Sequence, residues 1–238
     1  MLRAVLFIIL FSIAIKLDAQ SINQLNPAGK KTGVWIGYHE GTSAKRYKGS
    51  FVEGVPTGKF TYYAKEGYIS GVVDFINDSV TSSVMYYENG FSMAKGKFIN
   101  KKKEGKWFTY SISGDLLNIY TYKNGMQNGM QYTYYPKNKE TNKVGLMEEF
   151  NCVNGLKDGS WKQYYPLGTI QAQGKFAMGK RQGVFTYFFS NGDIDMKGKF
   201  VDNLKQGYWE KYNSETFEMD KIIYIKGEVK KELKNDKQ

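Results

Sequence analysis

Residues 170–188, with the sequence IQAQGKFAMGKRQGVFTYF, contain the pattern from which most of the chain is built. Apolar and polar residues alternate up to Phe176, the segment Gly179–Gly183 interrupts the alternation, and an aromatic residue follows at Phe185. Because successive side chains of a strand point to opposite faces of a sheet, the alternation predicts a half-buried strand. The glycine segment predicts a turn that leads to the next strand.

The alternation also assigns a face to each side chain. One face receives four residues of this strand and four of the matching strand further along: Ile170, Ala172, Gly174, Phe176, Ile194, Met196, Gly198 and Phe200. The other face receives polar residues such as Gln173 and Lys175. A glycine on the apolar face leaves a gap, which we expect a Trp or Phe of the adjoining strand to fill.

The same pattern recurs along the chain. Six glycines are each followed by an aromatic residue at the second and at the fifth position: Gly33, Gly58, Gly105, Gly159, Gly183 and Gly207. The aromatic residues at the second position are Trp35, Phe60, Trp107, Trp161, Phe185 and Trp209. Weaker copies begin at Ser82 and Gly129, and an insertion falls at Pro136–Val144. The sequence therefore predicts about eight hairpins of roughly 24 residues each.

The sequence also indicates the turns of the hairpins and the placement of their aromatic residues. Asn-Gly pairs favour tight hairpin turns, because both residues tolerate positive φ, and they occur at Asn89-Gly90, Asn124-Gly125, Asn154-Gly155 and Asn191-Gly192. Aromatic residues three apart, such as Trp161 and Tyr164, fall on opposite faces of a regular strand. Either a β-bulge redirects one of them, or the sheet carries aromatic residues on both faces.

The segment Tyr47-x-Gly49-x-Phe51-x-x-Gly54-x-x-x-Gly58 resembles the MORN repeat, and the Gly-x-Trp half resembles its bacterial, antitoxin-like variant. The resemblance covers roughly residues 33–212 and implies an all-β fold, an elongated single-layer twisted meander of antiparallel hairpins. With a closing strand at residues 221–226, we expect the repeat domain to span residues 33–226. It implies interaction with proteins or membrane surfaces rather than chemistry. The repeat positions are Gly49, Phe51, Gly58, Phe98, Gly105, Trp107, Gly159, Trp161, Gly174, Phe176, Gly183, Phe185, Gly198, Phe200, Gly207 and Trp209.

Composition narrows the class of protein. With 1 His and 1 Cys in 238 residues, zinc sites of Cys and His, disulfide frameworks and most histidine-based catalysis are nearly excluded. We therefore expect no enzyme, cofactor or metal. Residues 1–19 have the layout of a cleavable signal peptide, which predicts an extracytoplasmic protein: periplasmic, cell-surface or secreted. Residues 20–32 are expected to form a linker and residues 227–238 a polar, charged tail.

The charge is basic, with 34 Lys and Arg against 23 Asp and Glu. Lys97, Lys175 and Lys199 precede the repeat Phe in three units, so stacked hairpins could align them in a basic ladder. We expect the partner to be another envelope or secreted protein. The alternative is a glycan, cell-wall polymer or anionic lipid, bound by the ladder and by exposed rings at Tyr38, Tyr63, Tyr110 and Tyr164. Nucleic acid is not expected as a partner.

Overall fold

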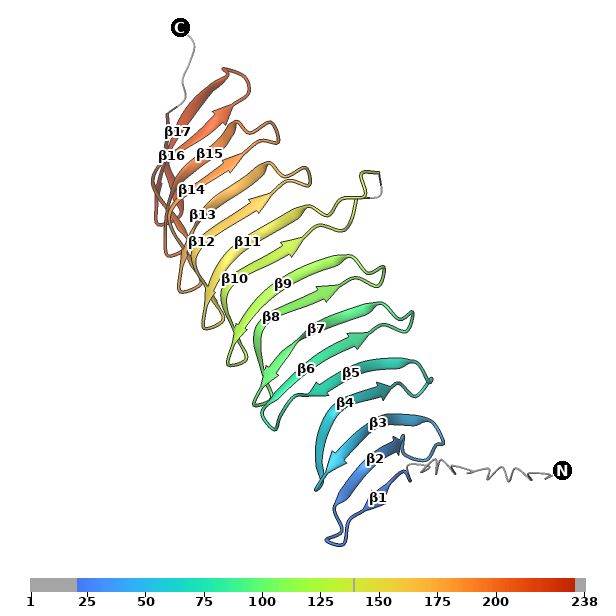
Figure 1. The fold of residues 1–238 in the computed structure, drawn as a ribbon. Coiled ribbons are helices and arrows are strands. Elements are labelled where there is room, and N and C mark those ends of the chain that lie inside the picture. Colours follow the sequence, from blue (N-terminus) through green and yellow to red (C-terminus); the bar gives the residue numbers. More distant parts are fainter. Residues whose placement is uncertain (1–20, 139, 234–238) are drawn as a thin grey trace, which may run out of the picture.

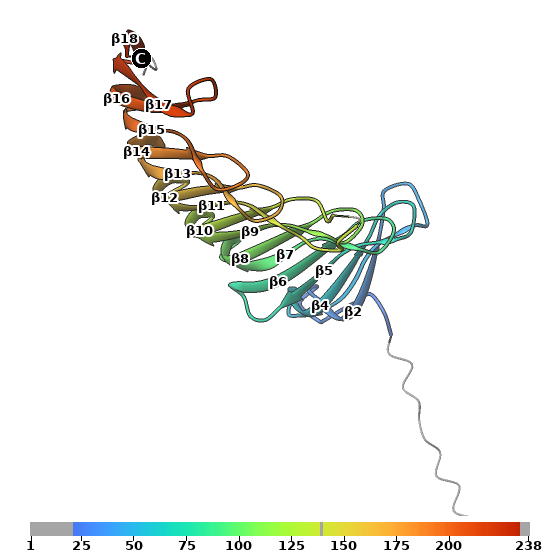
Figure 2. The same ribbon diagram turned by 90° about the horizontal axis from the view of Figure 1, so that it is seen from above.

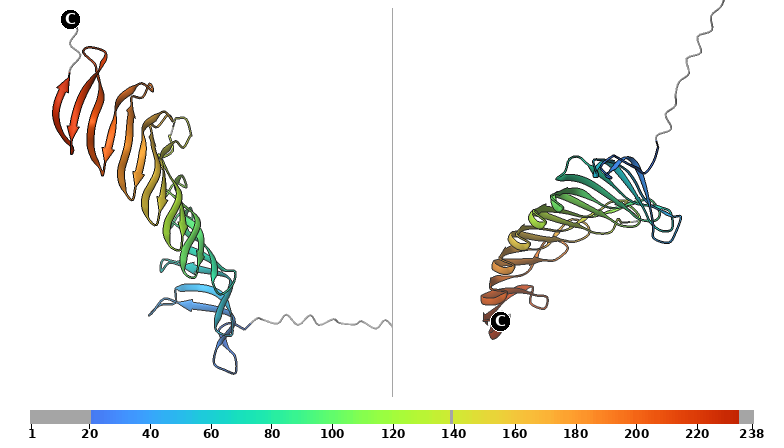
Figure 3. Two further views of the ribbon diagram at one scale, coloured as in Figure 1. Left: turned by 90° about the vertical axis from the view of Figure 1, so that its left-hand side faces the viewer. Right: turned by 90° about the horizontal axis from the view of Figure 1, so that it is seen from below.

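The computed structural model describes residues 21–138 and 140–233, so the predicted signal peptide lies outside the described residues. It is one open, all-β sheet of 18 strands, drawn in Figure 1 as a long strip with one layer. Each strand pairs antiparallel with the next along the chain. The strip twists along its length (Figures 2 and 3), and the predicted antiparallel meander is confirmed.

The strands are β1 (Gln24–Leu25), β2 (Lys31–Tyr38), β3 (Lys45–Val52), β4 (Val55–Tyr63), β5 (Ile69–Phe75), β6 (Val80–Tyr86), β7 (Ser92–Ile99), β8 (Lys102–Tyr110), β9 (Leu116–Lys123), β10 (Met126–Tyr134), β11 (Leu146–Val153), β12 (Leu156–Tyr164), β13 (Ile170–Ala177), β14 (Lys180–Phe188), β15 (Ile194–Val201), β16 (Leu204–Asn213), β17 (Glu218–Ile225) and β18 (Glu228–Leu233). The sheet thus extends beyond residues 33–226: β1 lies in the expected linker and β18 in the expected tail.

The two long edges of the strip differ in their connections. One edge carries several two-residue turns in which both residues have positive φ, as at Asn124-Gly125 and Asn154-Gly155, while the connection between β5 and β6 on this edge is the longer segment of residues 76–79. The other edge carries longer loops (Figure 1), and these contain Asn89-Gly90 and Asn191-Gly192, where the glycine has positive φ. The Asn-Gly pairs therefore form tight turns at the first two sites and not at the other two.

The segment Gly179–Gly183 is not a turn as a whole. The turn is Met178-Gly179, and β14 begins at Lys180. Gly183 lies inside β14 with φ of 80° where the register against β13 shifts between Gln173 and Lys175, so it forms a β-bulge that needs glycine. The two glycines of this segment therefore have different roles: Gly179 belongs to the turn, and Gly183 forms the bulge inside β14.

The predicted role of the recurring strand glycine is confirmed. A Cβ at Gly174 would lie 2.6 Å from ring atoms of Phe185, which covers the glycine and has no exposed surface. Ring and glycine are paired in the same way in three more hairpins: Phe60 over Gly49, Trp107 over Gly96 and Trp209 over Gly198. We call the face that carries these rings the aromatic face.

In the two weak copies of the repeat, the glycine position holds a larger side chain and the position of the covering ring holds a smaller one, so the space between them is still filled. Val73 replaces the strand glycine opposite Ser83, and Tyr120 replaces it opposite Gln131. Gln131 is fully buried, and its amide bonds the backbone three times: Thr121 N–H donates to Oε1 at 3.0 Å, and Nε2 donates to the carbonyls of Thr121 and Gly129 at 3.1 and 2.9 Å. A buried amide so bonded carries no unsatisfied polar cost.

The sheet carries aromatic residues on both faces. β12 and β13 stay in register from Gly159 to Gln163, so Trp161 and Tyr164 diverge. Trp161 Nε1 donates to Glu148, whereas the Tyr164 hydroxyl donates to the neighbouring residue Glu149, on the opposite face. The second of the two sequence alternatives is therefore the correct one.

The face assignment of two residues was wrong. The register shifts after Gln163, so Ile170 pairs with Tyr164 while Ala172 pairs with Gln163. Since directly paired side chains share a face, Ile170 leaves the aromatic face. The equivalent shift pairs Ile194 with Phe188. Alternation alone cannot reveal such a bulge, because it assumes a regular strand.

Candidate interaction surface

Lys97, Lys175 and Lys199 are exposed, and they lie on the face opposite the aromatic one, next to the repeat Phe. They do not form a continuous ladder. With strands about 4.8 Å apart, Lys175 and Lys199 lie roughly 10 Å from each other and Lys97 roughly 29 Å from Lys175. Thr121 and Asn151 occupy the intervening positions on β9 and β11.

The tyrosines expected to be exposed differ among themselves. Tyr38 is 46% exposed, whereas Tyr63, Tyr110 and Tyr164 are half-buried. Lys95 Nζ lies 5.4 Å from the ring centroid of Tyr110. Burial, the 2.7 Å hydrogen bond to Glu149 and the charge of that carboxylate raise the pKa of Tyr164 to about 12. Of the four rings, Tyr38 is therefore the one that offers an open stacking surface.

The aromatic face carries a second set of basic residues, which the sequence reasoning missed. Each stands two residues before a repeat glycine, and its charged group lies over one of the rings. The set, here called the cation row, consists of Lys31, Lys103, Lys157, Arg181 and Lys205. The last three lie on the alternate strands β12, β14 and β16 and form its continuous part, whereas β4, β6 and β10 supply no cation at this position. The nearest ring centroids lie at 4.4 Å (Trp35), 4.5 Å (Trp107), 4.1 Å (Phe150), 5.2 Å (Phe200) and 4.4 Å (Trp209), respectively. At such distances a cation is attracted to the ring face.

Backbone hydrogen bonds fix the row at the tight-turn edge. The carbonyl of each cation residue accepts the N–H of the second turn residue of the next hairpin, for example from Gly179 to Lys157 at 2.8 Å and from Gly227 to Lys205 at 2.9 Å. The same bond holds the other three: Gly54 to Lys31, Gly125 to Lys103 and Asn203 to Arg181. Equivalent positions in successive hairpins are therefore locked in register.

The residue after four of the five cations supports the same turns. Asp158 accepts the N–H of Met178, and Gln206 accepts the N–H of Lys226. Glu104 and Gln182 do so for Asn124 and Asp202. In these four units a basic residue, then an acid or amide, then the repeat glycine is a signal that was visible in the sequence; the unit of Lys31 has Thr32 in the second position.

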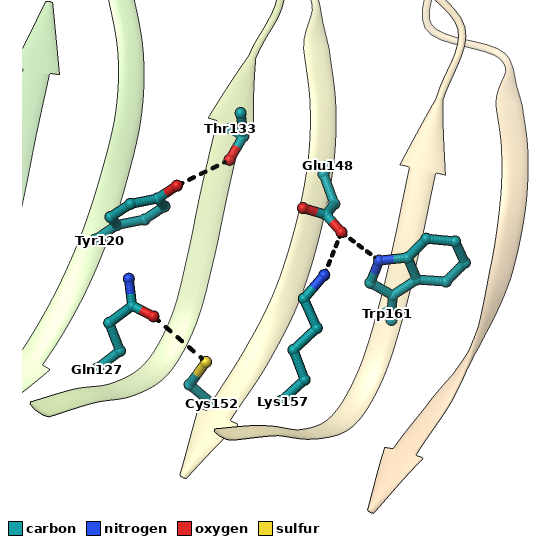
Figure 4. Close-up of polar contacts among 7 residues, drawn as sticks. All are labelled: Tyr120, Gln127, Thr133, Glu148, Cys152, Lys157 and Trp161. Carbon is teal, nitrogen blue, oxygen red and sulfur yellow. Dashed lines mark hydrogen bonds and ion pairs between the residues drawn. The ribbon is translucent and has the colours of Figure 1, made fainter. Parts of the chain in front are cut away.

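The cations differ in how far their charge is compensated. Lys157 forms an ion pair with Glu148, which also accepts a 2.5 Å hydrogen bond from Trp161 Nε1 (Figure 4). Lys31 and Lys205 donate to phenol oxygens, those of Tyr47 at 3.1 Å and Tyr224 at 3.4 Å. Within residues 21–138 and 140–233, Lys157 is the member of the row with a carboxylate within ion-pair distance. The other four keep their charge available to a ligand.

A shallow groove of about 470 Å³ opens between two of these cations. Arg181 and Tyr187 line it from β14 and Lys205 from β16, with Met196 and Phe200 of β15 between these strands; Asp195, Asn203, Leu204 and Gly227 complete the lining. We call it the Arg181–Lys205 groove. Arg181 is exposed, so the guanidinium faces solvent while it lies over Phe200.

The lone thiol belongs to the centre of the sheet and not to this groove. Cys152 is 2% exposed, and its Sγ lies 4.0 Å from Gln127 Oε1 (Figure 4). Burial raises the pKa of the thiol, with the positive charge of Lys157 opposing the shift. A buried, protonated thiol is a poor nucleophile, so Cys152 acts as a small packing residue.

No protein-family model matches the sequence, and no curated protein matches it. In the described part of the chain, no group of three or more His, Cys, Asp and Glu residues could hold a metal ion. No helix among the described residues is long and apolar enough to cross a membrane.

Proposed function

We propose that the protein is a non-enzymatic, exported scaffold of the MORN-like type that its repeats resemble, and that it binds a protein partner. The partner contacts the aromatic face along the tight-turn edge, where the cation row lies. The observation that carries the proposal is the set of cations held in register over the rings, four of which have no carboxylate within ion-pair distance in the described residues.

A protein partner fits this surface better than a sugar polymer. Trp107 and Trp209 are 3% and 0% exposed, because each covers a strand glycine, so their faces are not free for sugars to stack on. Cations beside apolar side chains such as Met196 and Leu204 are the mixture found at protein interfaces. A carboxylate of a partner would meet a charge already oriented by the sheet.

A matched pair of variants tests the proposal. The full-length chain with a C-terminal tag is used to capture proteins from envelope extract, alongside Lys103→Gln/Arg181→Gln/Lys205→Gln and Lys97→Gln/Lys175→Gln/Lys199→Gln. Each variant removes three positive charges. The first variant removes them from the aromatic face and the second from the opposite face. We expect the aromatic-face variant to lose the partner at least about tenfold, and the opposite-face variant to retain it. Equal retention by both variants contradicts the proposal.

The alternative, a glycan or anionic-lipid binder, has one observation in its favour. A shallow depression on β12–β14 has polar groups in its lining, among them Ser160, Lys162, Gln173, Lys175 and Gln182, beside apolar surface from residues such as Val184. If this is the site, the same pair of variants gives the reverse result, with loss in the opposite-face variant, and the bound material is glycan or lipid.

A further inference from the structure

We infer that the partner presents an extended, polyproline-type segment with an acidic residue at every third position. Two of its carboxylates bind Arg181 and Lys205, one at each side of the Arg181–Lys205 groove. The inference deepens the proposed function and rests on it, since it names the chemistry of the segment that the scaffold binds.

The spacing of the row carries the inference. Arg181 on β14 and Lys205 on β16 occupy the same repeat position, and the turn bonds hold both backbones in register. Two strands at about 4.8 Å each place equivalent atoms roughly 9.6 Å apart. A polyproline II segment advances about 3.1 Å per residue with three residues per turn, which is roughly 9.3 Å between residues on one side. A segment that crosses the strands therefore presents every third side chain at the spacing of the row.

Other backbone conformations match this spacing less well. An α-helix has a pitch of about 5.4 Å. Acidic residues on one face that match the row would therefore be seven residues apart in sequence, at a distance of roughly 10.5 Å. In a β-strand, residues three apart are separated by about 10 Å, which is near the spacing of the row, but their side chains point to opposite sides. In a polyproline II helix, every third side chain lies on the same side, and the distance between such side chains matches the distance between alternate strands of the sheet.

The chain itself shows a carboxylate bound in the row. On β12, the alternate strand before β14, Glu148 of the neighbouring strand β11 bonds both the ammonium of Lys157 and the indole N–H of Trp161 (Figure 4). In β13 and β15 the residues equivalent to Glu148 are Ala172 and Met196, so these hairpins supply no acid of their own there. A ligand carboxylate at Arg181 or Lys205 would take the place that Glu148 takes at Lys157.

The lining of the groove fits such a segment and sets one limit. Tyr187 and Met196 offer apolar surface against which proline rings can pack, and Arg181 can bond a carboxylate through two parallel N–H groups. Asp195 also lines the groove and repels an acidic ligand. Asp195→Asn is therefore expected to tighten binding.

The test uses labelled synthetic peptides of one composition and two arrangements. One repeats Pro-Pro-Asp, and the other gathers the same Asp residues in a central block between prolines. Binding to the full-length protein is measured by fluorescence anisotropy, together with Arg181→Gln/Lys205→Gln and the matched control Lys175→Gln/Lys199→Gln. Circular dichroism checks that each variant is folded.

We expect the periodic peptide to bind at least about tenfold more tightly than the block peptide, and the groove variant to abolish that difference. The control variant should preserve it, and Asp195→Asn should lower the dissociation constant of the periodic peptide. Equal affinity for the two peptides overturns the inference. So does tighter binding of a heparin-derived oligosaccharide at the same cations, which would assign the groove to an acidic glycan.

The two failures can be told apart. If the peptides bind equally but Arg181→Gln/Lys205→Gln still loses the captured envelope protein, the spacing inference fails and the proposed function stands. If neither the peptides nor the captured protein depends on these two cations, both fail.

Discussion

The hairpins β13–β16 and β9–β12 solve the same packing problem in different ways. In β13–β16, Phe185 and Trp209 cover glycines, and Phe200 meets each of them edge-on with centroids 5.0 Å away. Trp209 Nε1 then reaches the carbonyl of Lys199 at 3.2 Å. One large ring over one glycine, flanked by a Phe, is the regular arrangement.

In the central hairpins, large and small side chains occupy different positions of the repeat. Phe150 occupies the glycine position opposite Trp161, and Cys152 occupies the position of the flanking Phe. The indole of Trp161 bonds Glu148 in place of a backbone carbonyl. On β9 and β10, Tyr120 likewise occupies the glycine position, and the smaller Gln131 occupies the position of the covering ring. The comparison indicates that the sheet requires a constant filled volume and a partner for each polar group, and not a fixed set of residues.

The largest expected effect comes from breaking the central arrangement at Phe150, which is 7% exposed. Phe150→Gly gives the strand its regular glycine but leaves Cys152 too small to flank Trp161. The resulting cavity should lower the free energy of unfolding by about 4 kcal/mol, measured by urea unfolding.

The double variant Phe150→Gly/Cys152→Phe sharpens this prediction, because it rebuilds the pair found at Gly174 and Phe176. We expect it to recover roughly half of the lost stability. A double variant no more stable than Phe150→Gly would show that the two positions do not compensate each other.

The next effect breaks the regular arrangement. Gly174→Ala places a Cβ 2.6 Å from ring atoms of Phe185, and we expect a loss of about 2 to 3 kcal/mol in urea unfolding. Gly71→Ala is the matched control, since Gly71 is also a strand glycine without positive φ and its Cβ would meet one carbonyl oxygen at 3.3 Å. That change should stay within about 1 kcal/mol. Equal losses at the two glycines would mean that the covering ring is not the reason for the glycine.

The regular hairpins could be predicted from the sequence because their signal is local. Gly183 and Phe185 lie two residues apart, and alternation around Gly174 gives its face without knowledge of any partner strand. Ser83 and Gln131 could not be interpreted in this way, because the residues that compensate for them, Val73 and Tyr120, lie on neighbouring strands, and the local sequence does not give the register. The pair Val73–Ser83 lies in a regular ladder, whereas a bulge shifts the register next to Gln131.

The candidate site was less predictable than the fold. Basic residues two positions before each repeat glycine were visible, but whether Lys205 reaches the aromatic face depends on the bulge at Gly207. The lysines chosen from sequence, such as Lys175, are exposed on the opposite face. The cations of the row are held in register by the turn-to-carbonyl bond, a contact between residues 22 or 23 positions apart that no local pattern encodes.

The smallest expected effect concerns the opposite face, where the central strand again departs from its neighbours. β11 places Glu149 where β3, β7 and β15 have lysine, and this carboxylate accepts a hydrogen bond from the hydroxyl of Tyr164. The pKa of Tyr164 therefore rises from its ordinary value near 10 to about 12 in the folded protein. Between these pH values the unfolded chain releases the proton and the folded chain keeps it. The contribution of Tyr164 to stability is thus complete below about pH 10 and is lost as the pH rises towards 12.

Urea midpoints measured across this window should fall less steeply with pH for Tyr164→Phe than for the unmodified chain. Glu149→Gln should flatten the curve as well, because it removes the charge while keeping an acceptor. Since Tyr164 is partly exposed, solvent screens the interaction and the difference is expected to be smaller than either packing effect. Parallel curves for all three proteins would show that the Glu149 carboxylate does not hold the proton on Tyr164, and that the central hairpins differ from the regular ones in packing on the aromatic face alone.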